Sequence, residues 1–211
     1  MFNKVDSKYN WIELKKFVQD SLKNEMTGHD YDHVNRVLKN AMLISRDLSI
    51  NYNILLASIL LHDISFKEGG PSKTHHIKSA EIARSILPDY GFESALIKNI
   101  SHAILNHNRS FSPYDKIEDL TIEAKVLYDA DTLDALGVIG LIRMISFSIN
   151  QKIPYYKSAE DSLNVSFFGN INFLKQMKEN LILDNSKLIA NKRMKIIDEF
   201  LEQMKKELVS F

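Results

Sequence analysis

His62 and Asp63 stand side by side directly after ILLASILL, the longest apolar run in the chain. An imidazole and a carboxylate at the end of so apolar a helix are costly to bury unless something pairs them. A divalent cation is one such partner, because both groups are good ligands for borderline and hard metal ions. Taken by itself, the dipeptide is more often an ordinary helix-ending His followed by an Asp that caps the next turn.

Other histidines and aspartates recur at helical spacing. His29 and His33 are four residues apart, so they share one helix face. Asp131 and Asp134 lie inside the largely apolar segment AKVLYDADTLDALGVIGLI, where carboxylates usually need a partner. The alternative for these two aspartates is a solvated acidic stripe. Together with the dipeptide, the pattern favours a buried metal site.

The rest of the chain must supply helices to hold these residues. Most segments have helical periodicity, and seven Gly and four Pro leave little turn chemistry, so we predict an all-α fold. The third predicted helix is apolar nearly all round, which places it at the centre of a bundle. Helices are expected over residues 11–23, 30–48 (with Asp30 as N-cap), 53–63, 74–87, 92–106, 121–149, 172–178 and 186–208.

Composition narrows the classes of protein. Lys+Arg and Asp+Glu both number 27, so the chain lacks the basic excess of a dedicated nucleic-acid binder. The absence of cysteine excludes disulfides, thiolate metal sites and a thiol nucleophile, and it favours a cytoplasmic location. No apolar run approaches the roughly 20 residues of a membrane span. No Gly-rich phosphate loop is present either.

The order H…HD…D, formed by His33, His62, Asp63 and Asp131, resembles the signature of the HD superfamily of metal-dependent phosphohydrolases. The segments GHDYDHVNRV, ASILLHDI, HHIKSAEIA, EAKVLYDADTLDALGVIG and ANKRMKIIDEFLEQM extend the resemblance over residues 25–208. It implies one HD domain over residues 1–211. The helical core would span residues 25–150, and C-terminal helices 151–211 would pack on it. It also implies a central ion (Mn, Mg, Co, Ni, Fe or Zn) held by those four residues.

The same resemblance suggests roles for further residues. In some HD proteins extra histidines hold a second metal, so the candidate ligands of that ion are His75, His76 and His107. Alternatively, these histidines contact substrate phosphate, or His75 and His76 simply lie near a helix N-terminus. Of the adjacent pair, we expect His75 to face solvent. Residues that could contact the substrate or orient a ligand are His29, Asp134, Arg36 and Arg143, with a simple ion pair as the alternative for the arginines.

The leading functional prediction is hydrolysis of a phosphoester or phosphoanhydride bond in a small phosphorylated substrate, with a nucleotide as the favoured substrate. In its sharpest form, a nucleoside triphosphate is cut to monophosphate and pyrophosphate. An ion in the site would lower the pKa of a bound water and neutralise phosphoryl charge. Phe66 and Lys67 stand where guanosine tetraphosphate hydrolases of the superfamily carry acidic residues, which disfavours that substrate.

Two departures from relatives concern specificity: Thr132 replaces a basic residue, and Phe167-Phe168 replaces a His-Phe pair. A di-iron oxygenase of the HD type and a catalytically silent ligand-binding module remain as alternative functions. A homodimer is also left open, since the amphipathic final helix could cover the site or a partner subunit.

Overall fold

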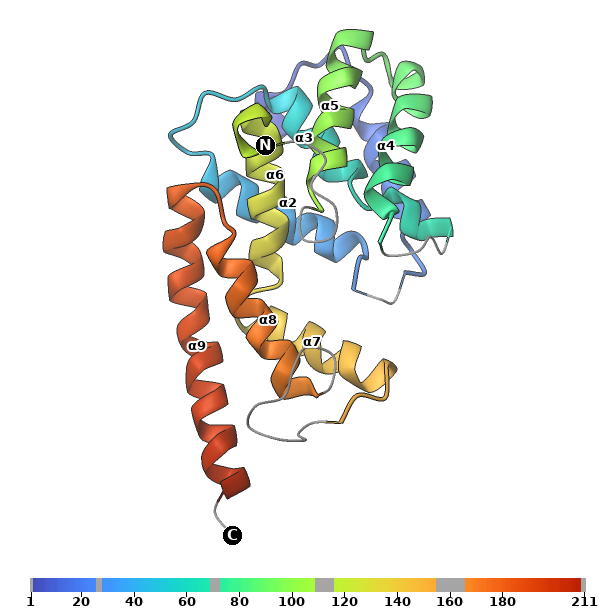
Figure 1. The fold of residues 1–211 in the computed structure, drawn as a ribbon. Coiled ribbons are helices and arrows are strands. Elements are labelled where there is room, and N and C mark those ends of the chain that lie inside the picture. The colour runs from blue at the N-terminus through green and yellow to red at the C-terminus, as the bar shows by residue number, and fades with distance from the viewer. Residues whose placement is uncertain (1, 26–27, 69–72, 109–115, 155–165, 210–211) are drawn as a thin grey trace. The chain divides into compact units, whose positions relative to one another are not determined.

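The computed structural model describes residues 2–25, 28–68, 73–108, 116–154 and 166–209. Within these ranges every regular element is a helix (Figure 1), which confirms the predicted all-α class. The chain divides into two compact units, Met1–Asp131 and Thr132–Phe211, and each is described by itself. The prediction of a single domain over the whole chain stays a prediction.

The first unit is built around α3 (Tyr52–Leu61). Every residue of α3 from Ile54 to Leu61 is buried, and α3 contacts α1 (Trp11–Ser21), α2 (Tyr31–Ile44), α4 (His75–Ile86) and α5 (Ser94–Asn106). Its apolar surface therefore meets a neighbour on every side, as predicted from its composition. Short 3₁₀ helices occupy Phe2–Lys4, Ile64–Glu68, Leu87–Tyr90 and Ile117–Asp119.

Helix caps fix the two helices that lead into the site. The Asp30 carboxylate accepts a hydrogen bond from the backbone N–H of His33, as expected of an N-cap, and so sets the turn that carries His33. Asn51 caps α3 in the same way, accepting from Asn53 and Ile54. The helix α6 (Ile122–Asp134) is tied to α2 by the Asn40 side-chain amide, which donates to the Ala130 carbonyl at 2.9 Å.

The second unit contains the end of α6 with α7 (Val138–Asn150), α8 (Phe167–Glu179) and α9 (Asp184–Val209); α7, α8 and α9 contact one another. The prediction of one helix over residues 121–149 was wrong. Turns from Thr132 and Leu133 close α6, and Gly137 has φ 84°, a conformation that L side chains rarely adopt. The glycines of ALGVIG are the sequence signal for this break.

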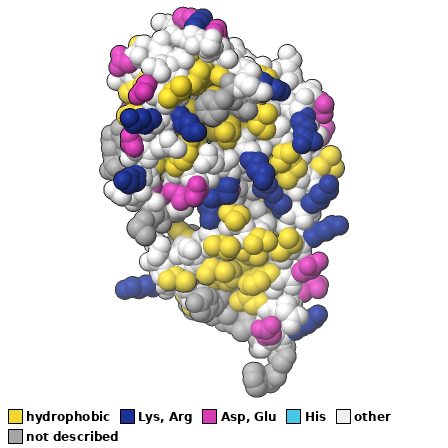
Figure 2. Space-filling model, turned by 180° about the vertical axis from the view of Figure 1, so that it is seen from behind, with side chains coloured by type: hydrophobic (Ala, Val, Ile, Leu, Met, Phe, Trp, Pro, Cys, Tyr) yellow, Lys and Arg dark blue, Asp and Glu magenta, His cyan; other side chains and the backbone are white. Residues whose placement is uncertain are grey.

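Large hydrophobic side chains remain exposed in the second unit. They include Val138, Ile142 and Ile149 on α7 and Leu188 and Ile196 on α9. Figure 2 shows hydrophobic side chains gathered over the lower part of one face. Among the described residues no single helix is long and apolar enough to cross a membrane, although α6 and α7 pass that test of length and composition as a bent pair.

Candidate metal centre

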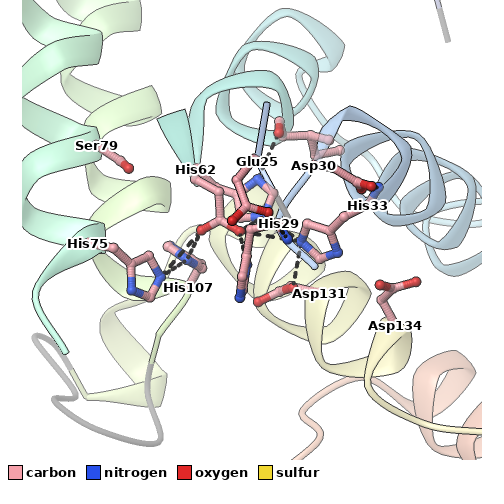
Figure 3. A network of polar contacts seen from close by, with 12 residues as sticks. Glu25, His29, Asp30, His33, His62, His75, Ser79, His107, Asp131 and Asp134 are labelled. Carbon is pink, nitrogen blue, oxygen red and sulfur yellow. Dashed lines mark hydrogen bonds and ion pairs between the residues drawn. The ribbon is translucent and has the colours of Figure 1, made fainter. Parts of the chain in front are cut away.

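The candidate site lies where several helices of the first unit begin or end. Its members come from sequence positions far apart, and Figure 3 shows the side chains of His33, His62, His75, His107 and Asp131 pointing toward one another. They are His33 in the first turn of α2, His62 at the C-cap of α3 with Asp63 directly after it, His75 at the start of α4, His107 at the C-cap of α5, and Asp131 on α6.

One half of the site surrounds Oδ2 of the buried Asp63. This oxygen lies 3.4 Å from Nε2 of His33 and 3.3 Å from Nε2 of His62, and these two nitrogens are 3.2 Å apart. Asp131 Oδ1 lies 3.3 Å from Nε2 of His33. The four residues of the H…HD…D pattern thus direct two nitrogens and two carboxylates at one small volume.

The other half surrounds Oδ1 of the same carboxylate. Nε2 of His75 lies 3.4 Å from this oxygen and Nε2 of His107 lies 3.5 Å from it, while the two nitrogens are 3.0 Å apart. Asp63 is therefore flanked by imidazoles on both of its oxygens. Oδ1 is buried and has no hydrogen-bond partner in the part of the chain that the structure describes.

His62 and His107 are oriented by the same device. Nδ1 of His62 lies 2.8 Å from the Ile59 carbonyl, and Nδ1 of His107 lies 2.7 Å from the Ile104 carbonyl, each three residues earlier on the helix that it ends. A carbonyl oxygen can only accept, so Nδ1 carries the proton in both rings. In the neutral ring, Nε2 then presents a lone pair toward Asp63, the tautomer that a metal ligand needs.

The electrostatics favour a charged carboxylate at the centre. Burial alone would raise the pKa of the Asp63 carboxyl, but the electrostatic attraction of the neighbouring His62 and His29 rings outweighs it and holds that pKa well below 3.8. Burial likewise opposes ionisation of Asp131, and the hydrogen bond and charge of His33 lower its pKa. Burial opposes the charge on His107 too, yet the carboxylates of Asp63 and Asp131 raise its pKa above 6.5.

Three overlapping groups of ligand atoms lie within metal-binding distance. Within each group the candidate donor atoms are no more than 4.8 Å apart. The groups are His29, His33 and Asp63; His33, His62 and Asp131; and His62, Asp63 and His107. This cluster could hold a divalent ion.

His75 lies inside the cluster and not at the surface. We expected His75 to face solvent, but it is only 8% exposed and faces Asp63 and His107. Because α4 begins at His75 itself, the first helical turn directs this side chain inward. His76 is also buried, and its Nδ1 lies 3.5 Å from the side-chain nitrogen of Asn108; burial lowers its pKa.

His29 belongs to the site through a short contact. Its Nδ1 lies 2.6 Å from Oδ2 of Asp63, and because the charged carboxylate only accepts, this nitrogen donates. Its side chain is 27% exposed, more than those of the other histidines that face Asp63. In Figure 3 its second nitrogen points away from the cluster of dashed lines. His29 is thus the most exposed of the imidazoles that face Asp63, and its contact with a substrate stays a prediction.

Sequence reasoning missed two residues that hold His29. The ring of Phe66 stacks on His29 with centroids 4.2 Å apart and planes inclined by 5°, and it also lies 5.1 Å from the ring of His75. The Glu25 carboxylate accepts from the backbone N–H of His29 at 2.8 Å. Phe66 drew attention in the sequence only because it is not acidic, and nothing in the sequence pairs its ring with His29.

The remaining predicted residues have simpler surroundings. Arg143 donates to the Asp134 carboxylate at 2.8 Å within the second unit, which is the ion pair that the sequence left open. Asp134 is in none of the ligand groups found among the described residues. Arg36 lies half-buried on α2, three residues after His33. Roles for these three residues in substrate binding stay predictions.

Comparison with known proteins establishes the family. The HD domain family model matches residues 30–136. The chain belongs to the HD domain family. The uncharacterized protein YpgQ of Bacillus subtilis is 27% identical over 198 residues, 93% of this chain and 92% of that protein.

Solved structures of HD proteins share the fold. An HD-superfamily hydrolase from Bacillus thuringiensis is similar with a TM-score of 0.71 and 25% identity, over 93% of this chain and 95% of that one. The B. subtilis YpgQ structure in complex with ADP has a TM-score of 0.72 and 23% identity, over 93% of each chain. The resemblance seen in the sequence is therefore confirmed: the chain is a member of the HD hydrolase superfamily.

Proposed function

We propose that this protein is a metal-dependent hydrolase of phosphoanhydride bonds in nucleotides. In the sharpest form of the proposal, it cuts a nucleoside triphosphate to the monophosphate and pyrophosphate. The observation that carries the proposal is the buried Asp63 carboxylate, which has imidazole nitrogens directed at both of its oxygens. Membership of the HD hydrolase superfamily supports the same class of reaction.

The donor set fits a cation. A lone pair on Nε2 of neutral His62 or His107 faces a charged oxygen at 3.3 or 3.5 Å, which is repulsive unless a proton or a metal ion lies between them. Oδ1 of Asp63, which is buried without a hydrogen-bond partner among the described residues, likewise requires a proton or a cation. We assign a first ion to His33, His62, Asp63 and Asp131.

A second ion would share Asp63 with the first. His75 and His107 face the other oxygen of this carboxylate, and His76 lies beside them. Two divalent cations would exceed the negative charge of Asp63 and Asp131 and leave positive charge for an anionic substrate. We assign His75 and His107 to this second position, with His76 as a further candidate for that ion or for substrate phosphate.

Bound ions would activate a water and neutralise charge on the phosphoryl oxygens. The residues of the chain would do the rest. Asp131 is the most exposed of the first four, with a side chain 27% accessible, so its second carboxylate oxygen is available to orient the attacking water. His29 anchors one nitrogen on Asp63 and presents the other outward, where it could contact a phosphoryl oxygen. The water oxygen would form a bond to the α-phosphorus while the bond from that phosphorus to the leaving pyrophosphate oxygen breaks, and the proton that the water loses would pass to solvent.

A nucleotide is the favoured substrate because a structure of YpgQ contains ADP, and YpgQ aligns with this chain over nearly its whole length. The His75–His107 pair keeps one alternative open, since a di-iron oxygenase of the HD type would need such a second position. An iron content near two per chain, with colour and no phosphate release, would favour that alternative.

A metal-supplemented activity screen tests the proposal. The purified chain is incubated with Mn, Mg, Co or Ni and with nucleoside mono-, di- and triphosphates, while phosphate, pyrophosphate and metal content are measured. We expect metal-dependent release of pyrophosphate from a triphosphate. Metal binding without turnover of any nucleotide would contradict the proposal and leave a ligand-binding module.

A further inference from the structure

A second hollow lies on the first unit, along α5. Its volume is about 520 Å³, and its lining comes from the end of α4, the 3₁₀ helix that follows it, and one face of α5. None of the lining residues belongs to the metal-centre cluster. They are Arg84, Pro88, Ser94, Ile97, Lys98, Ser101, His102 and Leu105. We call this hollow the α5 groove.

The charged groups that line the α5 groove are of one sign. Arg84 and Lys98 are both exposed, and neither makes an ion pair with the described residues. No acidic side chain is in the lining. The carboxylate of Glu93, the N-cap residue of α5, is already engaged by Lys8 at 2.6 Å and by the Tyr9 hydroxyl at 2.7 Å. Two cations are therefore left to attract an anion from solution.

The floor of the α5 groove is mainly apolar, with one polar exception. Pro88, Ile97 and Leu105 supply hydrophobic surface. Ser101 lies among them, is 3% exposed, and its hydroxyl has no hydrogen-bond partner among the described residues. A buried hydroxyl without a partner is unfavourable and is usually satisfied by water or by a ligand. This hydroxyl and the two cations are independent features of one hollow.

We propose that the α5 groove binds a small organic anion, a phosphate or carboxylate carried on an aromatic or aliphatic body. The anionic group would contact Arg84 and Lys98, the body would cover Ile97 and Leu105, and the Ser101 hydroxyl would turn to the ligand. The volume suits such a molecule, because small-molecule sites commonly enclose about 300–1,000 Å³. The site is separate from the metal centre, although α5 serves both, since it also carries His107.

The test is a chemical-shift titration of the ¹⁵N-labelled full chain, loaded with Mg. The probes are phenyl phosphate, benzoate and inorganic phosphate. We expect phenyl phosphate or benzoate to shift amides of Ile97, Lys98 and Ser101, and inorganic phosphate to bind more weakly at these positions. Whichever of phenyl phosphate and benzoate binds more tightly identifies the anionic group. Shifts confined to the surroundings of His62 would overturn the proposal.

Substitutions in the α5 groove test which side chains contribute to binding of the probe. Arg84→Glu with Lys98→Glu should weaken binding of the better probe at least about tenfold, the scale of a lost charged hydrogen bond. Lys192→Glu with Lys195→Glu, two exposed positions on α9, makes the same change in net charge and should leave binding within about twofold. Equal weakening in both double variants would reduce the effect to net charge and overturn the site. Ser101→Ala, which keeps every charge, should weaken binding modestly.

Discussion

Two ion-pair networks in this protein have equally short contacts but differ in their exposure to solvent. Lys8 and Glu93 meet at 2.6 Å with side chains 52% and 53% exposed, and Tyr9 adds a hydrogen bond. His29 and Asp63 also meet at 2.6 Å, but Asp63 has a side chain only 2% exposed. Lys8 and Tyr9 lower the pKa of Glu93 to about 2 by hydrogen bonding, whereas the pKa of Asp63 is low despite its burial.

The difference shows what separates a site from an ordinary ion pair. Glu93 has one donor for each of its oxygens and is exposed to water, so its network is complete. Asp63 is buried, one of its oxygens has no hydrogen-bond partner in the described chain, and five imidazoles surround it and Asp131. Both networks contain short contacts. Only the second contains a buried carboxylate oxygen without a hydrogen-bond partner among the described residues.

The substitution with the largest expected effect on the buried network is Asp63→Asn, which keeps the shape of the side chain and removes its negative charge. We expect it to lose both ions and to lower kcat/KM by more than about 100-fold, since even residues that only orient metal ligands commonly matter 10- to 100-fold. Metal content per chain and turnover are measured together. Full metal occupancy in this variant would show that Asp63 is not the centre of the site.

A second pair of variants separates the two halves. Asp131→Ala touches only the half on Oδ2, and we expect loss of the first ion together with activity. His107→Ala touches the half on Oδ1, and we expect reduced activity with at least one ion retained. Metal analysis after dialysis distinguishes the outcomes. If His107→Ala loses all metal, the two halves form a single primary site.

Protonation should reveal the cluster in the metal-free protein. The raised pKa of His107 contributes stability that is fully present below pH 6.5 and is lost as pH rises through the higher folded value. The lowered pKa values of Asp63 and Asp131 contribute stability that is lost as pH falls below 3.8. Denaturant unfolding between pH 5 and 9 should therefore show a steeper alkaline loss for the native sequence than for His107→Gln. If stability depends on pH in the same way in both proteins, the charge on His107 does not contribute to stability.

A smaller effect is expected at Phe66, which lies flat on His29. Phe66→Leu keeps an apolar side chain but removes the stacking, and we expect kcat to fall roughly 3- to 10-fold, the scale of an aromatic pair. Phe66→Tyr should restore it, because a phenol ring stacks in the same way. Metal content should stay constant in both variants. Equal losses in the two variants would show that stacking on His29 does not account for the effect.

The sequence predicts the helical parts of this architecture well. The apolar third helix, the Asp30 cap and the H…HD…D residues depend on local pattern, and local pattern decides burial and helix register here. His75 was misplaced because we expected only one of two adjacent histidines to be buried, whereas both are buried in the first turn of α4. The stacking of Phe66 on His29 could not be predicted from the sequence, because it depends on how the 3₁₀ helix Ile64–Glu68 packs against the histidine cluster.

The smallest expected effect completes the comparison and lies in the exposed network. Lys8→Ala removes the contact of 2.6 Å, yet exposed ion pairs are weak because water and salt screen them. We expect metal content and activity to be unchanged and the denaturant midpoint to fall only slightly. The pKa of Glu93, followed by NMR, should move from about 2 toward 4.5 but stop short of it, since the Tyr9 hydrogen bond remains. A large loss of stability in Lys8→Ala would show that distance, and not burial, governs the two networks.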